Sequence, residues 1–111
     1  MKVSFNGFGE NTVTFEIQGT INNGAPVMVT SNGKVSAANG AFCGVCINQR
    51  NGYAAVLLRG YAKVPYSGTA PTVGYAKLTS TSGKIAVDNS NGRSVLVIDV
   101  DTTGKTAGII L

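Results

Sequence analysis

The most regular stretch of the chain is residues 53–66, YAAVLLRGYAKVPY, where apolar and polar side chains alternate around a dense apolar run. Successive side chains of a β-strand point to opposite faces, so one face of this stretch is apolar throughout. The other face begins apolar and becomes polar at Arg59. The pattern predicts one strand over residues 54–64, buried on both sides at its start, with a bulge or sharp bend at Gly60.

Shorter segments with the same alternation occur along the rest of the chain, separated by Asn-Gly and Ser-Gly pairs that are typical of turns. They predict further strands at residues 13–17, 26–30, 35–37, 42–48, 73–78, 85–87, 94–99 and 106–111. No window shows helical periodicity over more than two turns, and the 111 residues include 15 glycines. We therefore expect one all-β domain, a small β-barrel or β-sandwich.

The pattern of turns and strands is similar in two parts of the chain. An Ala-Pro pair, a Gly-Lys hairpin tip, an asparagine and an apolar strand follow each other in residues 24–60 and again in residues 69–111. Two copies are too few for a solenoid, which needs about three stacked units. The repetition predicts two similar β halves that pack face to face.

The first residues differ from the rest. Residues 1–12 hold Phe5 and Phe8 among turn-forming residues, and we interpret them as an extended N-terminal arm on a β domain of residues 13–111. An apolar arm cannot bury itself alone. We therefore expect it to dock on the body, on a sister chain or on another protein.

Charge and leader signals change this picture little. The net charge is +4, which is low for a nucleic-acid binder and fits a solvated surface. Met1 and Lys2 are followed by no apolar run, so we expect no signal peptide and no membrane span. The two cysteines fit a reducing compartment better than a disulfide scaffold.

Few residues are suited to catalysis. The chain contains no histidine, which excludes Ser-His-Asp and Cys-His arrangements and histidine metal ligands. Cys43 and Cys46 match C-x-x-C, but three residues apart on a strand they would lie on opposite faces, and the chain lacks two further zinc ligands. We interpret them as small buried hydrophobes and expect no metal or other cofactor.

Asp99 and Asp101 form the only closely spaced carboxylate pair. Such a pair can serve glycoside hydrolysis or calcium binding. Here it lies at the end of a predicted strand that enters Thr-Thr-Gly, so a turn with solvated charges is the simpler interpretation. We expect no catalytic residue and no enzymatic activity.

Four tyrosines keep a second function open. Tyr53, Tyr61, Tyr66 and Tyr75 occur with Arg50, Arg59 and Lys63 nearby, which is a composition suited to stacking single-stranded nucleic acid on a small barrel. Exposed strand tyrosines are also common at protein interfaces. A single-stranded nucleic-acid-binding barrel is therefore the alternative function, although the modest charge makes nucleic acid an unlikely partner.

Two long segments carry a family resemblance. The run CGVCINQRNGYAAVLLRGYAKVP, then PTVGYAKLTSTSGKIAV, a short VLVIDV and a final GIIL resemble the small decoration, or capsid cement, proteins of tailed bacteriophages. The shared features are the glycine turn at residues 51–52, the strands at 56–60 and 73–78, the Gly-Lys hairpin at 83–87 and the apolar end of the chain. Members of that family usually carry more acidic residues.

The resemblance implies a role and a partner. It implies a non-enzymatic protein on the outer surface of the virion head, made in the bacterial host cytoplasm, that binds the major capsid protein and forms a homo-oligomer such as a trimer. A small rigid β unit with an apolar arm suits that role, because repeated weak contacts add around a symmetry axis. The expected contact residues are Phe5, Phe8, Arg59, Tyr61 and Lys63.

Overall fold

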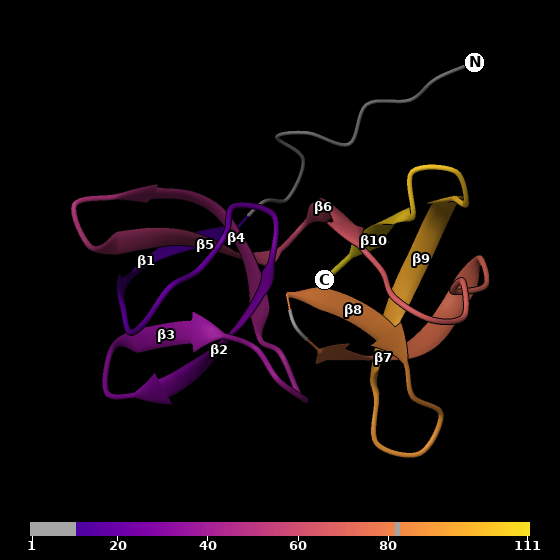
Figure 1. The fold of residues 1–111 in the computed structure, drawn as a ribbon, viewed down its shortest axis with the longest axis horizontal. Helices are drawn as coiled ribbons and strands as arrows, with labels where there is room; N and C mark the ends of the chain where they lie inside the picture. The colour runs from indigo at the N-terminus through magenta and orange to yellow at the C-terminus, as the bar shows by residue number, and fades with distance from the viewer. Residues whose placement is uncertain (1–10, 82) are drawn as a thin grey trace.

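A computed structural model of the protein describes residues 11–81 and 83–111 and contains no helix in that part of the chain. Its ten strands are β1 (Asn11–Ile17), β2 (Pro26–Ser31), β3 (Lys34–Ala37), β4 (Gly44–Arg50), β5 (Tyr53–Arg59), β6 (Tyr61–Pro65), β7 (Gly74–Thr81), β8 (Lys84–Val87), β9 (Arg93–Asp101) and β10 (Thr106–Ile110). The predicted all-β class is confirmed. The strands form two units, β1–β5 and β6–β10, which lie side by side in Figure 1.

The first unit is a closed barrel in the order β1-β3-β2-β4-β5. It closes because β1 pairs antiparallel with β5 on one side and parallel with β3 on the other. Its interior holds apolar side chains that are almost completely buried, namely Ile21, Val27, Val35, Cys46, Ala54 and Val56. Phe15 and Ile17 of β1 pack against this cluster, as expected for the apolar face of an alternating strand.

The second unit is a five-stranded antiparallel sheet in the order β6-β10-β9-β7-β8. A single parallel bridge between Tyr66 and Ile85 links its two edges, at the place where Ile17 and Val35 join β1 to β3 in the first unit. Counted from the first strand of each unit, the order of neighbours is therefore the same in both. The two halves share one connectivity, and the first is the more completely closed.

The hairpins β4-β5 and β9-β10 also match in register. Val45 pairs with Leu57 in the first, and Leu96 pairs with Ile110 in the second. In each hairpin one bulged residue has no partner on the opposite strand, Ile47 in β4 and Ile98 in β9. The bulged residue lies two positions after Val45 in the first hairpin and two positions after Leu96 in the second. Because the bulge occurs at the same place in both hairpins, the two hairpins can be aligned on it. Residues at the same distance from the bulge are then called equivalent. Val45 is thus equivalent to Leu96, and Leu57 to Ile110.

Gly60 separates the two units, which corrects the prediction of one strand over residues 54–64. β5 ends at Arg59 and β6 begins at Tyr61, and the two strands belong to different sheets. Gly60 has a φ of 123°, a conformation that residues with a side chain rarely adopt. The predicted bend is present at this glycine, but it carries the chain from one unit into the next instead of curling a single sheet.

The start of β5 is buried on both faces, as predicted. Val56 points into the barrel cluster, whereas Leu57 belongs to a second cluster that joins the units. That cluster contains residues of the first unit and of the second, which besides Leu57 are Ala38, Phe42, Val45, Ala62, Val64, Tyr66, Leu78, Ile85, Val95, Val97, Ala107 and Ile109. The outer face of β4-β5 is therefore core, because the second unit covers it.

A hydrogen-bonded contact supplements this apolar junction. Ser80 of β7 and Gly40 of the first unit exchange two backbone hydrogen bonds, with N–O distances of 2.8 and 2.9 Å. The Ser80 hydroxyl, in a side chain only 1% exposed, also donates to the Gly40 carbonyl oxygen at 2.7 Å. Ser80 is thus a polar residue that is fully paired inside the contact.

Ser80→Ala is expected to lower the free energy of unfolding by about 1 kcal/mol, because one buried hydrogen bond is lost while the Gly40 oxygen keeps its backbone donor. Urea unfolding measures the difference. Ser94→Ala, which truncates an exposed serine of β9, is the control and should change little. Equal effects of the two substitutions would contradict the role given to the buried hydroxyl.

A candidate binding surface at the junction of the units

Three of the predicted contact residues lie where the two units meet. Arg59 is the last residue of β5, and Tyr61 and Lys63 follow Gly60 in β6. We call Arg59, Tyr61 and Lys63 the junction surface. The side chains of Arg59 and Lys63 are exposed, and that of Tyr61 is half-buried.

The N-terminal arm joins the body at the same place. Asn11 of β1 pairs with Arg59, with a bulge before the next pair. The remaining predicted contact residues, Phe5 and Phe8, lie outside the described residues, as do residues 1–10 of the predicted arm. Residues 11 and 12 of that arm belong to β1.

Tyr61 lies across the second sheet toward β10 and β9. A Cβ atom on Gly108 would come within 2.8 Å of the Tyr61 ring and hydroxyl and 2.5 Å of Asp99 Oδ1, so only glycine leaves room for this arrangement. Asp99 Oδ1 accepts the Gly108 N–H at 3.0 Å. Burial and the Asp99 carboxylate together raise the pKa of Tyr61, so the phenol stays protonated and able to donate a hydrogen bond.

Lys63 of β6 pairs with Gly108 of β10, which pairs in turn with Asp99 of β9. Lys63 thus lies near the acidic end of β9. Asp101 there accepts the N–H groups of Thr103 and Gly104 at 3.0 and 3.1 Å, which closes the turn into β10. These hydrogen bonds, with a smaller contribution from the charge of Lys63, hold the pKa of the Asp101 carboxyl below its usual range. The interpretation of Asp101 as a turn residue is confirmed, whereas Asp99 holds Gly108 across the sheet.

Asp101→Asn tests the turn through its pH dependence. A carboxyl whose pKa is lowered on folding stabilises the protein above its unfolded value, and that contribution is lost as the pH falls through the folded pKa. The native protein should therefore lose stability below about pH 4, near the ordinary Asp value of 3.8, and Asp101→Asn should lose less. Asparagine keeps a turn acceptor but cannot ionise. Melting curves between neutral and acidic pH measure this, and parallel acid profiles would contradict it.

A shallow groove runs beside the junction surface. It has a volume of about 430 Å³ and is lined by Gly24, Val45, Cys46, Ile47, Tyr61, Ala62 and Lys63. Its walls come from β4 of the first unit and β6 of the second. Lys63 brings the only charged side chain, so the groove suits an apolar or aromatic group of a partner better than a charged small molecule.

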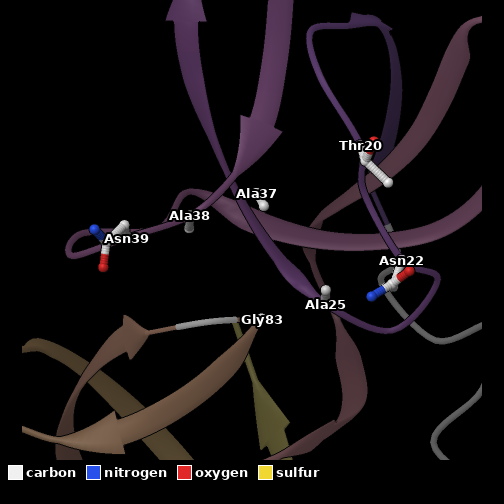
Figure 2. A pocket seen from close by; sticks show the side chains of 7 residues that line it. All are labelled: Thr20, Asn22, Ala25, Ala37, Ala38, Asn39 and Gly83. Carbon is white, nitrogen blue, oxygen red and sulfur yellow. The ribbon is translucent and has the colours of Figure 1, made fainter.

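A second pocket lies between the barrel and the tip of the β7-β8 hairpin. Its volume is about 330 Å³, and Figure 2 shows Thr20 and Asn22 before β2, Asn39 after β3 and Gly83 at the hairpin tip around it. Asn39 reaches away from the other two polar side chains in this view. The lining has no ionisable group, so no general acid or base is present there.

The two cysteines do not lie on opposite faces, contrary to the prediction. Cys46 is completely buried in the barrel cluster, and Cys43 packs against that same cluster. The chain bends before β4, which begins at Gly44, so Cys43 lies outside the strand. The two cysteines therefore have the same apolar surroundings and do not lie on alternate faces. Burial raises the pKa of both thiols, which keeps them protonated and weakly nucleophilic.

The four tyrosines do not form one platform. Tyr66 is only 4% exposed and belongs to the core, which corrects its place among the exposed tyrosines. Tyr53 lies on the first unit at the start of β5, paired with Arg50 of β4, whereas Tyr61 and Tyr75 lie on the second. Tyr75 is 80% exposed and pairs with Leu96.

An open row on the second unit was missed from the sequence. Tyr75, Leu96 and Ile110 occupy neighbouring places on β7, β9 and β10, and Tyr61 follows on β6. We call Tyr75, Leu96 and Ile110 the open row. The alternation in each strand marks these positions, but only the pairing register brings them together.

No family model, no curated protein and no solved structure matches this chain. In residues 11–81 and 83–111 no helix is long and apolar enough to cross a membrane. The same residues contain no cluster of three or more Cys, Asp or Glu that could hold a metal ion.

Proposed function

We propose that this chain is a non-enzymatic structural protein of a bacteriophage head. It binds the outer surface of the head as a decoration protein and stabilises contacts between coat subunits. The major capsid protein is its partner, and the junction surface together with the N-terminal arm makes the contact. The protein reaches this surface of the virion after synthesis in the bacterial cytoplasm.

The observation that supports this proposal most is the shared location of the arm and the junction surface. The arm meets the body at Asn11, directly opposite Arg59, which is two residues before Tyr61 in the chain. A partner bound at Arg59, Tyr61 and Lys63 would therefore also lie within reach of Phe5 and Phe8, since the six residues from Phe5 to Asn11 span up to about 20 Å when extended. Arginine and tyrosine are among the residue types most enriched in interface hot spots.

The core that the two units share supports the same role. The two units share one apolar cluster, so the junction surface lies on a fixed scaffold. A preorganised surface loses little entropy on binding, and the many equivalent sites of a head multiply a modest affinity. A protein of this kind needs no reactive pocket.

Co-sedimentation tests the proposal. Heads are assembled from the coat protein encoded in the same genome and purified without this chain, then mixed with it and sedimented. We expect saturable binding in a fixed ratio to the coat protein. Arg59→Glu with Lys63→Glu should weaken binding by about tenfold or more, because both exposed charges are reversed at the contact.

The matched control is Arg50→Glu with Lys84→Glu, which makes the same change in net charge at exposed positions away from the junction surface. Its binding should stay close to that of the native chain. No co-sedimentation, or equal losses in the two double variants, contradicts the proposal. Binding to single-stranded DNA that falls steeply with salt would support the nucleic-acid alternative instead.

A further inference from the structure

Equivalent surfaces of the two units differ in burial. In the first unit Pro26, Val45 and Leu57 form a row on β2, β4 and β5, and all three are completely buried or nearly so. Val45 and Leu57 are equivalent to Leu96 and Ile110 of the open row, which are only half-buried.

In the second unit Tyr75 of β7 pairs with Leu96, and in the first unit Pro26 pairs with Val45, the equivalent of Leu96. Tyr75 therefore extends the open row as Pro26 extends the row of the first unit. Tyr75 is 80% exposed. The second unit covers the row of the first, and nothing within residues 11–81 and 83–111 covers the row of the second.

The covering surface has an exposed counterpart as well. Two residues of the second unit that are buried against the first are Ala62 and Ser80, with exposures of 6% and 1%. Val13 pairs with Val56, and Ala62 pairs with Ile109, which is equivalent to Val56. Ala62 is therefore equivalent to Val13.

Counted from the β8 side, Ser80 holds the place of Val29, since each pairs with Ile85 or its equivalent Val35. β7 has two more residues than β2 between this place and the row. Val13 and Val29 are valines that are 38% and 52% exposed. We call Val13 and Val29 the open cover. An apolar row and an apolar cover are thus both exposed, at the two places where the junction between the units would continue.

We propose that a second copy of this chain binds head to tail, with the open cover of its first unit on the open row of the first copy's second unit. The contact between chains then repeats the contact that already joins the two units within one chain. Exposed Val13, Val29 and Tyr75 become buried, which removes apolar surface from water.

The interface is heterologous, because it joins two different surfaces. Such contacts close into a ring when the rotation between copies allows it, and otherwise continue as a filament. The inference rests on register and burial within the chain and does not depend on binding to a phage head. It goes beyond an expectation of oligomers, because it assigns the two surfaces.

Sedimentation velocity of the full chain at rising concentration is the first measurement, with no coat protein present. We expect reversible self-association. Tyr75→Glu on the row and Val29→Glu on the cover should each raise the dissociation constant by at least about tenfold, since each buries an unpaired charge. Tyr53→Glu changes an aromatic residue that is 50% exposed and lies on neither surface, and it should have no effect.

Mixing the two variants identifies the geometry. The Tyr75→Glu chain keeps an intact cover and the Val29→Glu chain keeps an intact row, so an equimolar mixture should form a dimer with one chain of each kind. Neither variant should dimerise alone. Circular dichroism confirms that each variant is folded, and Tyr75→Ser with Val29→Ser provides a milder second pair.

Three results would overturn the inference. The first is a chain that stays monomeric up to its highest soluble concentration. The second is association that Tyr75→Glu abolishes and Val29→Glu leaves intact, which indicates row-to-row dimers. The third is association that depends on Phe5 and Phe8 but not on Val29, which indicates that the arm covers the row. Failure of head binding alone would leave head-to-tail association standing, so the two proposals can be told apart.

Discussion

Gly44→Ala is expected to lower the free energy of unfolding by about 3 kcal/mol, the largest effect of any single methyl group that we predict. A Cβ atom at this position would overlap the Leu57 carbonyl oxygen and come within 2.8 Å of Val56 Cγ1. The first obstacle is backbone in the neighbouring strand, which cannot turn aside as a side chain can. β4 and β5 would have to separate where β4 begins.

Urea unfolding of Gly44→Ala and of Ile47→Ala compares the loss in free energy of unfolding at a close-packed and at an exposed position of the same strand. Ile47 lies on the same strand but is 45% exposed at the bulge, so its truncation should cost less than about 1 kcal/mol. A loss for Gly44→Ala within about 0.5 kcal/mol of zero would show that the two strands have room to separate. The close contact at Gly44 would then not limit stability.

Leu57→Ala is expected to cost about 3 kcal/mol, because Leu57 has no exposed surface and fills the cluster shared by both units. Truncation would leave a cavity between two sheets that pack through this side chain. The chain contains its own matched control in Ile110, which holds the equivalent place in the second unit and is half-buried. Ile110→Ala should cost about 1 kcal/mol, since less apolar surface is lost from a half-open site.

The comparison also tests how strongly the units depend on each other. Because Leu57 belongs to a cluster that spans both units, its loss should lower the unfolding midpoint of the whole chain in one transition. Tyrosine fluorescence and far-ultraviolet circular dichroism should therefore report the same midpoint. Equal losses for Leu57→Ala and Ile110→Ala would contradict the view that the second unit covers only the row of the first.

Local chemistry made several parts of the structure predictable. The strands could be predicted because the period of two in apolar positions is a property of adjacent residues. The same holds for Asp101, whose carboxylate accepts N–H groups two and three residues ahead. Arg59, Tyr61 and Lys63 were predicted as polar positions of a single strand, but Arg59 ends β5 and the other two lie in β6. That the arm joins the body opposite Arg59 could not be predicted either, because β1 and β5 are far apart in sequence.

The errors share one cause, which is that pairing between distant strands overrides a local pattern. Gly60 looked like a bend within a strand, yet the residues on its two sides pair with different sheets. Tyr66 looked exposed, but its parallel bridge to Ile85 draws it into the core. Cys43 and Cys46 were assigned to opposite faces because a regular strand was assumed through Gly44.

The sequence by itself determined that the chain forms short β-strands, where most of them turn, and that each has an apolar face, since these depend on neighbours within a few residues. Only the tertiary structure decided which apolar faces are covered. Leu57 and Ile110 have similar surroundings in sequence, yet one is core and the other half-exposed. The reason is that burial depends on what packs above a sheet, and in this chain a second unit lies over the first while the second keeps an open face.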